Sequence, residues 1–169
     1  PTHSADLVSS MSKSGKTQRP ASVFDPWNKK HVIAWKRWYG TTVLDFGAGL
    51  LDKALIMRDV MGVDCLAFEP YYTGGKDAGF DIEGARYITD VFLDRIATGL
   101  EFDSIFLASV LNSVPFKADR LHIVKIISAL ATKNTIVYAG AISKTSDRYL
   151  AAAGLKENIS NHETQFDSS

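Results

Sequence analysis

The stretch Val43-Leu44-Asp45-Phe46-Gly47-Ala48-Gly49 decides the fold class of this chain. A short apolar strand over 41–46 ends in a loop of small residues, and such a loop lets a ligand approach the backbone. In doubly wound sheets, ligands bind beyond the carboxyl ends of the parallel strands. The stretch therefore predicts the first strand of an α/β sheet, followed by a ligand-binding loop. Two glycines by themselves also fit a tight turn with positive φ.

Apolar runs alternate with helical spacing over the rest of the chain. Further strands are predicted at 63–68, 86–88, 104–110 and 135–141, and helices at 51–61, 91–98, 118–131 and 146–153. This alternation favours a doubly wound, mostly parallel sheet with helices on both faces. With 169 residues, 46% of them hydrophobic, we expect one α/β domain over 25–169 with its core at 41–142.

A helical extension is predicted ahead of the first strand. Residues 1–24 are rich in Ser, Thr and Lys without sustained periodicity, which predicts a flexible basic arm. Residues 26–39 predict an amphipathic helix with Asp25 as its N-cap and Gly40 as its stop signal. Helical spacing brings three apolar side chains to one face, those of Val32, Trp35 and Tyr39.

Charge is distributed unevenly along the chain. Residues 1–41 carry seven basic and two acidic side chains, a net charge of +5, whereas 42–169 carry twelve and seventeen, a net charge of −5. The basic side chains are Lys13, Lys16, Arg19, Lys29, Lys30, Lys36 and Arg37. Interleaved with Trp27, Trp35 and Trp38, they would suit single-stranded nucleic acid. Alternatively, the tryptophans pack the helix onto the sheet and the lysines are solvated, which is the interpretation that we favour.

Composition excludes several classes of protein. The single cysteine, Cys65, excludes a disulfide framework and a cysteine-rich zinc site, and we expect no metal. No apolar run approaches the roughly 18–20 residues that cross a bilayer. The first residues do not show the pattern of a secretion signal. We therefore expect a cytoplasmic location without membrane contact.

A carboxylate at the end of the second strand indicates a nucleoside ligand. Glu69 follows Gly49 by twenty residues, and a carboxylate there can accept hydrogen bonds from both hydroxyls of a ribose. The dinucleotide fingerprint would need glycine where this chain has Asp52, whose charge would repel a pyrophosphate. NAD and FAD are therefore disfavoured.

These motifs resemble those of class I S-adenosylmethionine-dependent methyltransferases. Val43–Gly49 is similar to motif I of that family, Phe68-Glu69-Pro70 to the acid after it, and Asp103–Pro115 to motif IV. The three arrive in the family's order, and the likeness covers about 41–142. Glu69–Tyr72 together with Val110–Val114 also resembles methyltransferases associated with DNA modification systems.

The resemblance implies a Rossmann-like fold and an S-adenosylmethionine-dependent methyltransferase whose acceptor, a nucleic acid or a small molecule, stays open. It implies cofactor contacts from Asp45, Gly47 and Gly49 at the methionine part, Glu69 at the ribose, Tyr71 and Asp90 at the adenine, and Ser109 and Leu111 below the sulfonium. Asn112 is the catalytic candidate, as a hydrogen-bonding group that orients the acceptor. His31 and His122 are expected to be ordinary surface or partly buried histidines.

Two departures from the family keep alternatives open. Leu51 stands where many members have a third glycine, and the chain ends soon after its last predicted helix. A non-catalytic cofactor-binding or partner subunit is one alternative. A nucleic-acid-binding module that uses the basic N-terminal segment is another. Without an Asn/Asp-Pro-Pro-aromatic motif or a Pro-Cys context for Cys65, methylation of a DNA amino group or of cytosine C5 is disfavoured.

Overall fold

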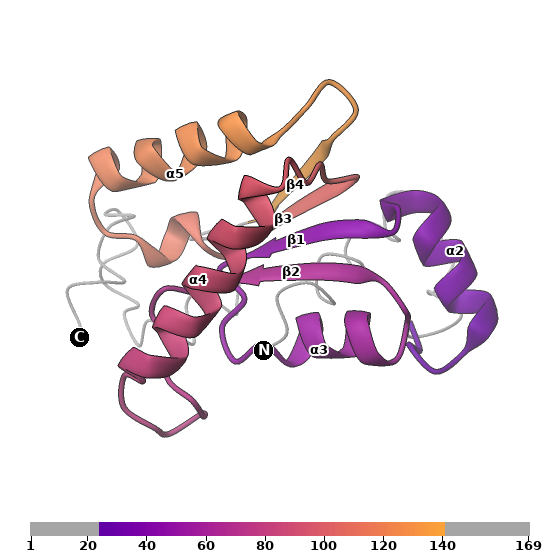
Figure 1. Ribbon diagram of the computed structural model, residues 1–169, viewed down its shortest axis with the longest axis horizontal. Coiled ribbons are helices and arrows are strands. Elements are labelled where there is room, and N and C mark those ends of the chain that lie inside the picture. Colours follow the sequence, from indigo (N-terminus) through magenta and orange to yellow (C-terminus); the bar gives the residue numbers. More distant parts are fainter. Residues whose placement is uncertain (1–23, 141–169) are drawn as a thin grey trace, which may run out of the picture.

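Four parallel strands form the centre of the fold. The computed structural model describes residues 24–140, and the sheet order is β2-β1-β3-β4 with every pair parallel (Figure 1). The strands are β1 (Thr42–Phe46), β2 (Asp64–Phe68), β3 (Ser104–Ala108) and β4 (Ile136–Gly140). The helices are α2 (Lys29–Tyr39), α3 (Asp52–Asp59), α4 (Ile82–Ala97) and α5 (Lys117–Leu130), with a 3-10 turn η1 (Leu111–Ser113).

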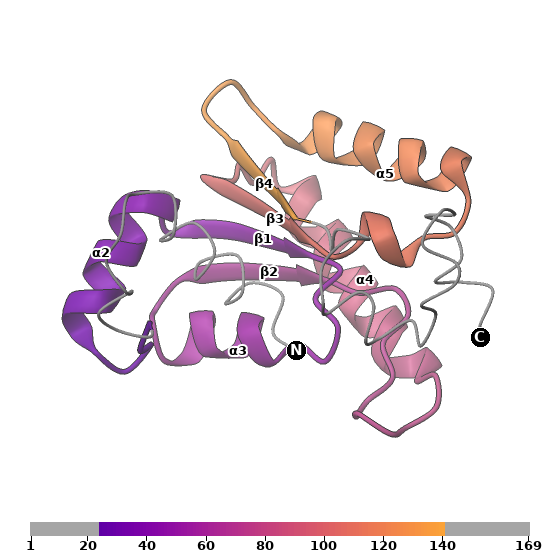
Figure 2. The same cartoon turned by 180° about the vertical axis from the view of Figure 1, so that it is seen from behind.

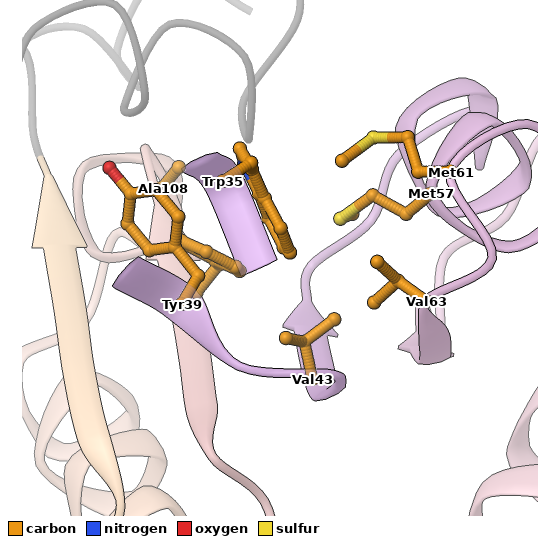
Figure 3. Packing of buried hydrophobic residues seen from close by; sticks show 8 residues of the cluster. Trp35, Tyr39, Val43, Met57, Met61, Val63 and Ala108 are labelled. Atoms are coloured by element: carbon orange, nitrogen blue, oxygen red, sulfur yellow. The ribbon is translucent and has the colours of Figure 1, made fainter. Parts of the chain in front are cut away.

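Two hydrophobic clusters cover the two faces of the sheet. On one face, α2 and the segment from α3 to β2 pack around Phe106, and Figure 3 shows Met57 and Met61 pointing toward Trp35. On the other face, Phe92 of α4 and Ile127 of α5 pack against Leu44 and Ile105. Neighbouring residues of a strand point to opposite faces, which is why Leu44 and Val43 belong to different clusters. The expected α/β sheet with helices on both faces is confirmed.

The predicted strand at 86–88 is wrong. These residues lie inside α4, which begins after Asp81, whose Oδ1 accepts the Gly84 N–H at 2.9 Å. The buried residues of α4 follow helical spacing, namely Ala85, Ile88 and Phe92. The helix expected at 91–98 is therefore only the second half of a longer one.

The helix expected at 26–39 begins later than predicted. Asp25 Oδ1 accepts the Trp27 N–H at 3.0 Å and closes a separate turn. Asn28 is the N-cap, because its side chain accepts the Lys30 N–H at 3.0 Å. Gly40 ends the helix with φ +81°, as expected.

The remaining elements agree with the sequence to within a few residues. The strands at 41–46, 63–68, 104–110 and 135–141 and the helix at 51–61 are each present and slightly shorter, and the helix at 118–131 is present one residue earlier with the same length. The arm predicted at 1–24, apart from its last residue, and the helix at 146–153 lie outside the described residues. No helix within 24–140 is long and apolar enough to cross a membrane.

Candidate functional site

A cavity lies at the carboxyl edge of the sheet. Its volume is about 660 Å³, within the range of small-molecule sites. It opens at the end of β1, which lies between β2 and β3. The chain continues from β1 to β2 on one side and later returns to β3 on the other side of β1. Ligands of open α/β sheets bind at this kind of switch point. The walls are formed by Phe46, Gly47, Gly49, Phe68–Tyr71, Ala108–Val110, Ser113–Phe116, Asp119, His122, Ile123 and Ile126.

Glu69 joins two loops of the cavity. Its Oε2 accepts the Gly49 N–H at 2.8 Å, and its Oε1 accepts the Tyr71 N–H at 3.1 Å. The carbonyl of Phe68 in turn accepts the N–H groups of Gly47 and Ala48, at 2.8 and 3.1 Å. An ionised carboxylate has about four acceptor positions, so two backbone donors leave room for the hydroxyls of a ligand.

The backbone of the cavity edge is held in left-handed conformations. Gly47 and Gly49 have φ of +78° and +57°, and two residues with side chains, the wall residue Ser109 and Leu51, which is not part of the wall, have φ of +57° and +65°. In residues 24–140 these two are the only non-glycine residues with positive φ. Each costs roughly 1–2 kcal/mol relative to the right-handed region. Backbone strain concentrated at one edge is typical of ligand sites.

Gly47 must be glycine for a second reason. A Cβ at this position would collide with Cγ2 of Val110, which follows β3 across the cavity edge. A β-branched valine has little freedom to move aside. The loop after β1 therefore lies directly against the side chain of Val110 in the segment after β3.

Five of the expected cofactor residues come together at the cavity: Gly47, Gly49, Glu69, Tyr71 and Ser109. Asp45 does not line it. Asp45 is only 2% exposed and lies close enough to Cys65 for its negative charge to affect the thiol. Burial, together with that carboxylate, raises the pKa of Cys65 far above its ordinary value, so the thiol stays protonated at neutral pH.

Three other expected site residues also lie away from the cavity wall. Asp90 is an exposed residue in the middle of α4, because the strand that was expected to precede it is helical. Leu111 packs into the cluster between the sheet and α5. Asn112 lies between Leu111 and the wall residue Ser113, and its buried Oδ1 has no hydrogen-bond partner among residues 24–140.

Asp103, the first residue of the motif IV likeness, lies at the opposite edge of the sheet. Its Oδ2 accepts the N–H groups of Thr41 and Thr42 at 2.8 and 3.0 Å, at the start of β1. A Cβ on Gly40 would collide with this side chain. Asp103 therefore fixes the entry of the chain into β1.

Sequence reasoning missed the α5 wall of the cavity. Asp119 and His122 line it together with Ile123 and Ile126, although His122 was expected to be an ordinary histidine. The spacing of these four residues places them on one helix face, which the sequence alone would have shown. That this face borders a cavity depends on how α5 packs against the sheet.

The charges on the cavity wall are acidic. Glu69 and Asp119 are carboxylates and His122 is an imidazole, whereas none of the wall residues is Lys or Arg. Arg120, next to Asp119, donates to the carbonyls of Val114 and Pro115 at 2.8 and 2.7 Å. The wall therefore favours ligands that are neutral or carry positive charge.

Within the described part of the chain, no group of three His, Cys, Asp or Glu side chains could hold a metal ion.

Comparisons with known proteins add no assignment. No family model matches the chain, and neither the curated proteins nor the solved structures contain a match.

Proposed function

We propose that this protein is a methyltransferase that uses S-adenosylmethionine. The main observation in favour is the bond from Gly49 N–H to Glu69 at the carboxyl edge of the sheet. It brings a glycine loop and a strand-end carboxylate to one cavity, a combination that suits a ribose-containing ligand. The cavity volume and the acidic wall suit a ligand that carries a sulfonium and an ammonium group.

The residues present fit that ligand. Glu69 would accept hydrogen bonds from the ribose hydroxyls, and the loop of Gly47 and Gly49 allows close approach to the backbone. Tyr71 is 78% exposed at the rim, where its ring could cover a flat base. Its ring centroid lies 6.4 Å from that of Phe80. S-adenosylmethionine would supply an activated methyl group at this site.

The chain also offers groups for an acceptor. Within residues 24–140, His122 is the one histidine on the cavity wall, and imidazole is the commonest general base in enzymes, so it is the group best suited to take a proton from an acceptor N–H or O–H. The Oδ1 of Asn112, which has no hydrogen-bond partner in the described part of the chain, would gain a donor if the acceptor entered beside Ser113. The acidic wall favours a neutral or cationic acceptor group, in a small molecule or in an extruded base.

Calorimetric titration tests the proposal directly. The purified chain is titrated with S-adenosylmethionine, S-adenosylhomocysteine and, as a control ligand, NAD. We expect the first two to bind and NAD to give no heat. Glu69→Ala should weaken binding about 10- to 100-fold, because hydrogen bonds to a charged group contribute roughly 1.5–3 kcal/mol.

A matched variant separates this effect from a general effect of removing charge. Glu101→Ala removes an exposed carboxylate that does not line the cavity and should leave the affinity unchanged. If neither S-adenosylmethionine nor S-adenosylhomocysteine gives heat of binding with the wild-type protein, the proposal is refuted. Equal weakening by both variants would refute the assignment of Glu69.

A non-catalytic cofactor-binding subunit is the second candidate. It is favoured by Leu51, which occupies a left-handed position that glycine would fill without strain, so the loop is not of the common family form. This candidate predicts cofactor binding by the chain alone, with methylation only after a second protein is added. Turnover by the isolated chain would exclude it.

A further inference from the structure

Helix α2 has two faces of different chemistry. On the inner face, Trp35 is 4% exposed, and its ring centroid lies 4.9 Å from that of Tyr39 and 6.1 Å from that of Phe106. Trp27 and Trp38, by contrast, are 69% and 75% exposed. The expectation that the tryptophans pack the helix onto the sheet is therefore confirmed for Trp35 and wrong for the other two.

The outward side chains combine aromatic rings with positive charge. We call them the α2 outer face: Lys29, Lys30, Ile33, Arg37 and Trp38 of the helix, together with Trp27 of the turn that precedes it. No acidic residue lies within α2. Lys36 is not included, because its Nζ donates to the carbonyl of Gly62 at 3.0 Å. Helical spacing places Lys30 and Arg37, seven residues apart, on the side opposite to Trp35.

This combination selects among the possible partners. A second copy of the same face would bring like charges together, which disfavours a symmetric dimer through α2. A membrane-bound amphipathic helix would turn its apolar stripe outward, whereas α2 buries Trp35 and Tyr39 and presents cations at the middle of its outer face. Cations for phosphates with aromatic rings for exposed bases match single-stranded nucleic acid.

We propose that the α2 outer face binds single-stranded DNA or RNA. The α2 helix lies near the amino ends of the strands, and the cavity lies at their carboxyl ends (Figures 1 and 2). The face therefore does not depend on the cavity, and the proposal holds whether or not the chain binds S-adenosylmethionine. Neither duplex DNA, whose bases are stacked inside, nor a bilayer would use the exposed rings in the same way.

Fluorescence anisotropy with a labelled oligothymidylate of about 15 nucleotides tests the proposal on the full chain. Trp38→Ala should weaken binding about tenfold, because stacking of one base on an aromatic ring contributes roughly 1–3 kcal/mol. Trp38→Phe should retain most of the affinity. The matched control is Tyr87→Ala, which removes another aromatic ring that is 71% exposed, from α4.

The contribution of the charged residues is measured by the salt dependence of the affinity. In a plot of log affinity against log salt concentration, the double variant K30A/R37A should make the negative slope less steep by about 1.4. Each phosphate contact to a single strand contributes about 0.7 to the steepness. The exposed Lys125 of α5 serves as the control through Lys125→Ala. Circular dichroism of every variant verifies that the fold is retained.

Three results would overturn the proposal. One is equal affinity of Trp38→Ala and Tyr87→Ala for the oligonucleotide. Another is tighter binding to a duplex of the same length than to the single strand. The third is binding to vesicles of phosphatidylcholine and phosphatidylserine that Trp38→Ala weakens while oligonucleotide binding stays the same, which would make the face a membrane contact.

Discussion

Glu69 Oε2 accepts the backbone N–H of Gly49 at 2.8 Å, and this bond links the end of β2 to the loop that follows β1. The other carboxylate oxygen accepts the N–H of Tyr71, so one side chain holds both loops of the cavity rim. A residue expected only to bind a ligand is therefore also a structural anchor. Its removal should affect the protein even when no ligand is present.

Replacing Glu69 should lower the stability of the ligand-free protein. Glu69→Ala leaves the N–H groups of Gly49 and Tyr71 without their acceptor, which should reduce the free energy of unfolding by about 1–2 kcal/mol. Urea unfolding followed by circular dichroism measures the change. Glu101→Ala is the control and should stay within about 0.5 kcal/mol of wild type. Wild-type stability of Glu69→Ala would show that the two bonds contribute nothing.

Relief of backbone strain at Leu51 should stabilise the protein. Asparagine tolerates the left-handed conformation and also caps a following helix well, and Leu51 is the N-cap of α3. We expect Leu51→Asn to raise the free energy of unfolding by about 1 kcal/mol. Leu51→Ala keeps the strain and loses apolar contact, so it should be less stable than Leu51→Asn. A higher midpoint of thermal unfolding for Leu51→Ala than for Leu51→Asn would contradict this expectation.

A side chain at Gly47 should collide with Val110. Gly47→Ala combines this collision with a left-handed φ and should cost about 2 kcal/mol of stability. Adding Val110→Ala removes the collision but not the backbone strain. The double-mutant cycle should therefore show a favourable coupling of at least about 0.5 kcal/mol. Strict additivity would mean that the loop moves away from the segment after β3.

Asp103 should matter for stability and not for the cavity. Asp103→Ala removes the acceptor of the Thr41 and Thr42 N–H groups, so unfolding should become easier by about 2 kcal/mol. Affinity for S-adenosylmethionine should not change at temperatures where the variant is folded, because Asp103 lies at the other edge of the sheet. A selective loss of affinity without loss of stability would place Asp103 in the site after all.

Stability should fall in alkaline solution partly because of Cys65. Its pKa is raised in the folded protein, first by burial and then by the Asp45 carboxylate. The unfolded chain releases the thiol proton above about pH 8.5, whereas the folded protein keeps it, so the stabilisation is complete below that pH and is lost above it. The slope reaches at most about 1.4 kcal/mol per pH unit. Cys65→Ala should flatten the stability profile above pH 9 by that amount, as measured by urea unfolding at several pH values.

The sequence predicted the local features well because they depend on neighbouring residues. The alternation around Leu44, the loop at Gly47 and the stop at Gly40 are local signals, and all three are present in the structure. The run at 86–88 misled because three residues are too few to separate a strand from a helix. Asp81 as an N-cap residue and the four-residue spacing of Ile88 and Phe92 indicate the helix that the structure contains.

Tertiary packing determined what the sequence could not show. Trp35 and Trp38 are three residues apart on α2, yet one is buried and the other exposed, because only a narrow side of the helix meets the sheet. In the same way, His122 borders the cavity because one face of α5 forms part of the cavity wall. Local spacing can place such residues on a helix face, but it does not reveal what that face meets.

The contact between Tyr39 and Tyr138, whose ring centroids lie 5.1 Å apart, joins the first described helix to the last described strand. The two residues are 99 positions apart in the chain. A ribosome must therefore synthesise almost the whole of the sheet before this aromatic cluster can close, and until then Trp35 lacks part of its final surroundings. Contacts of such long sequence separation slow folding. Within residues 24–140, we expect the docking of β4 beside β3 to come late in folding, with the surface of the nascent chain around α2 open to chaperones before it.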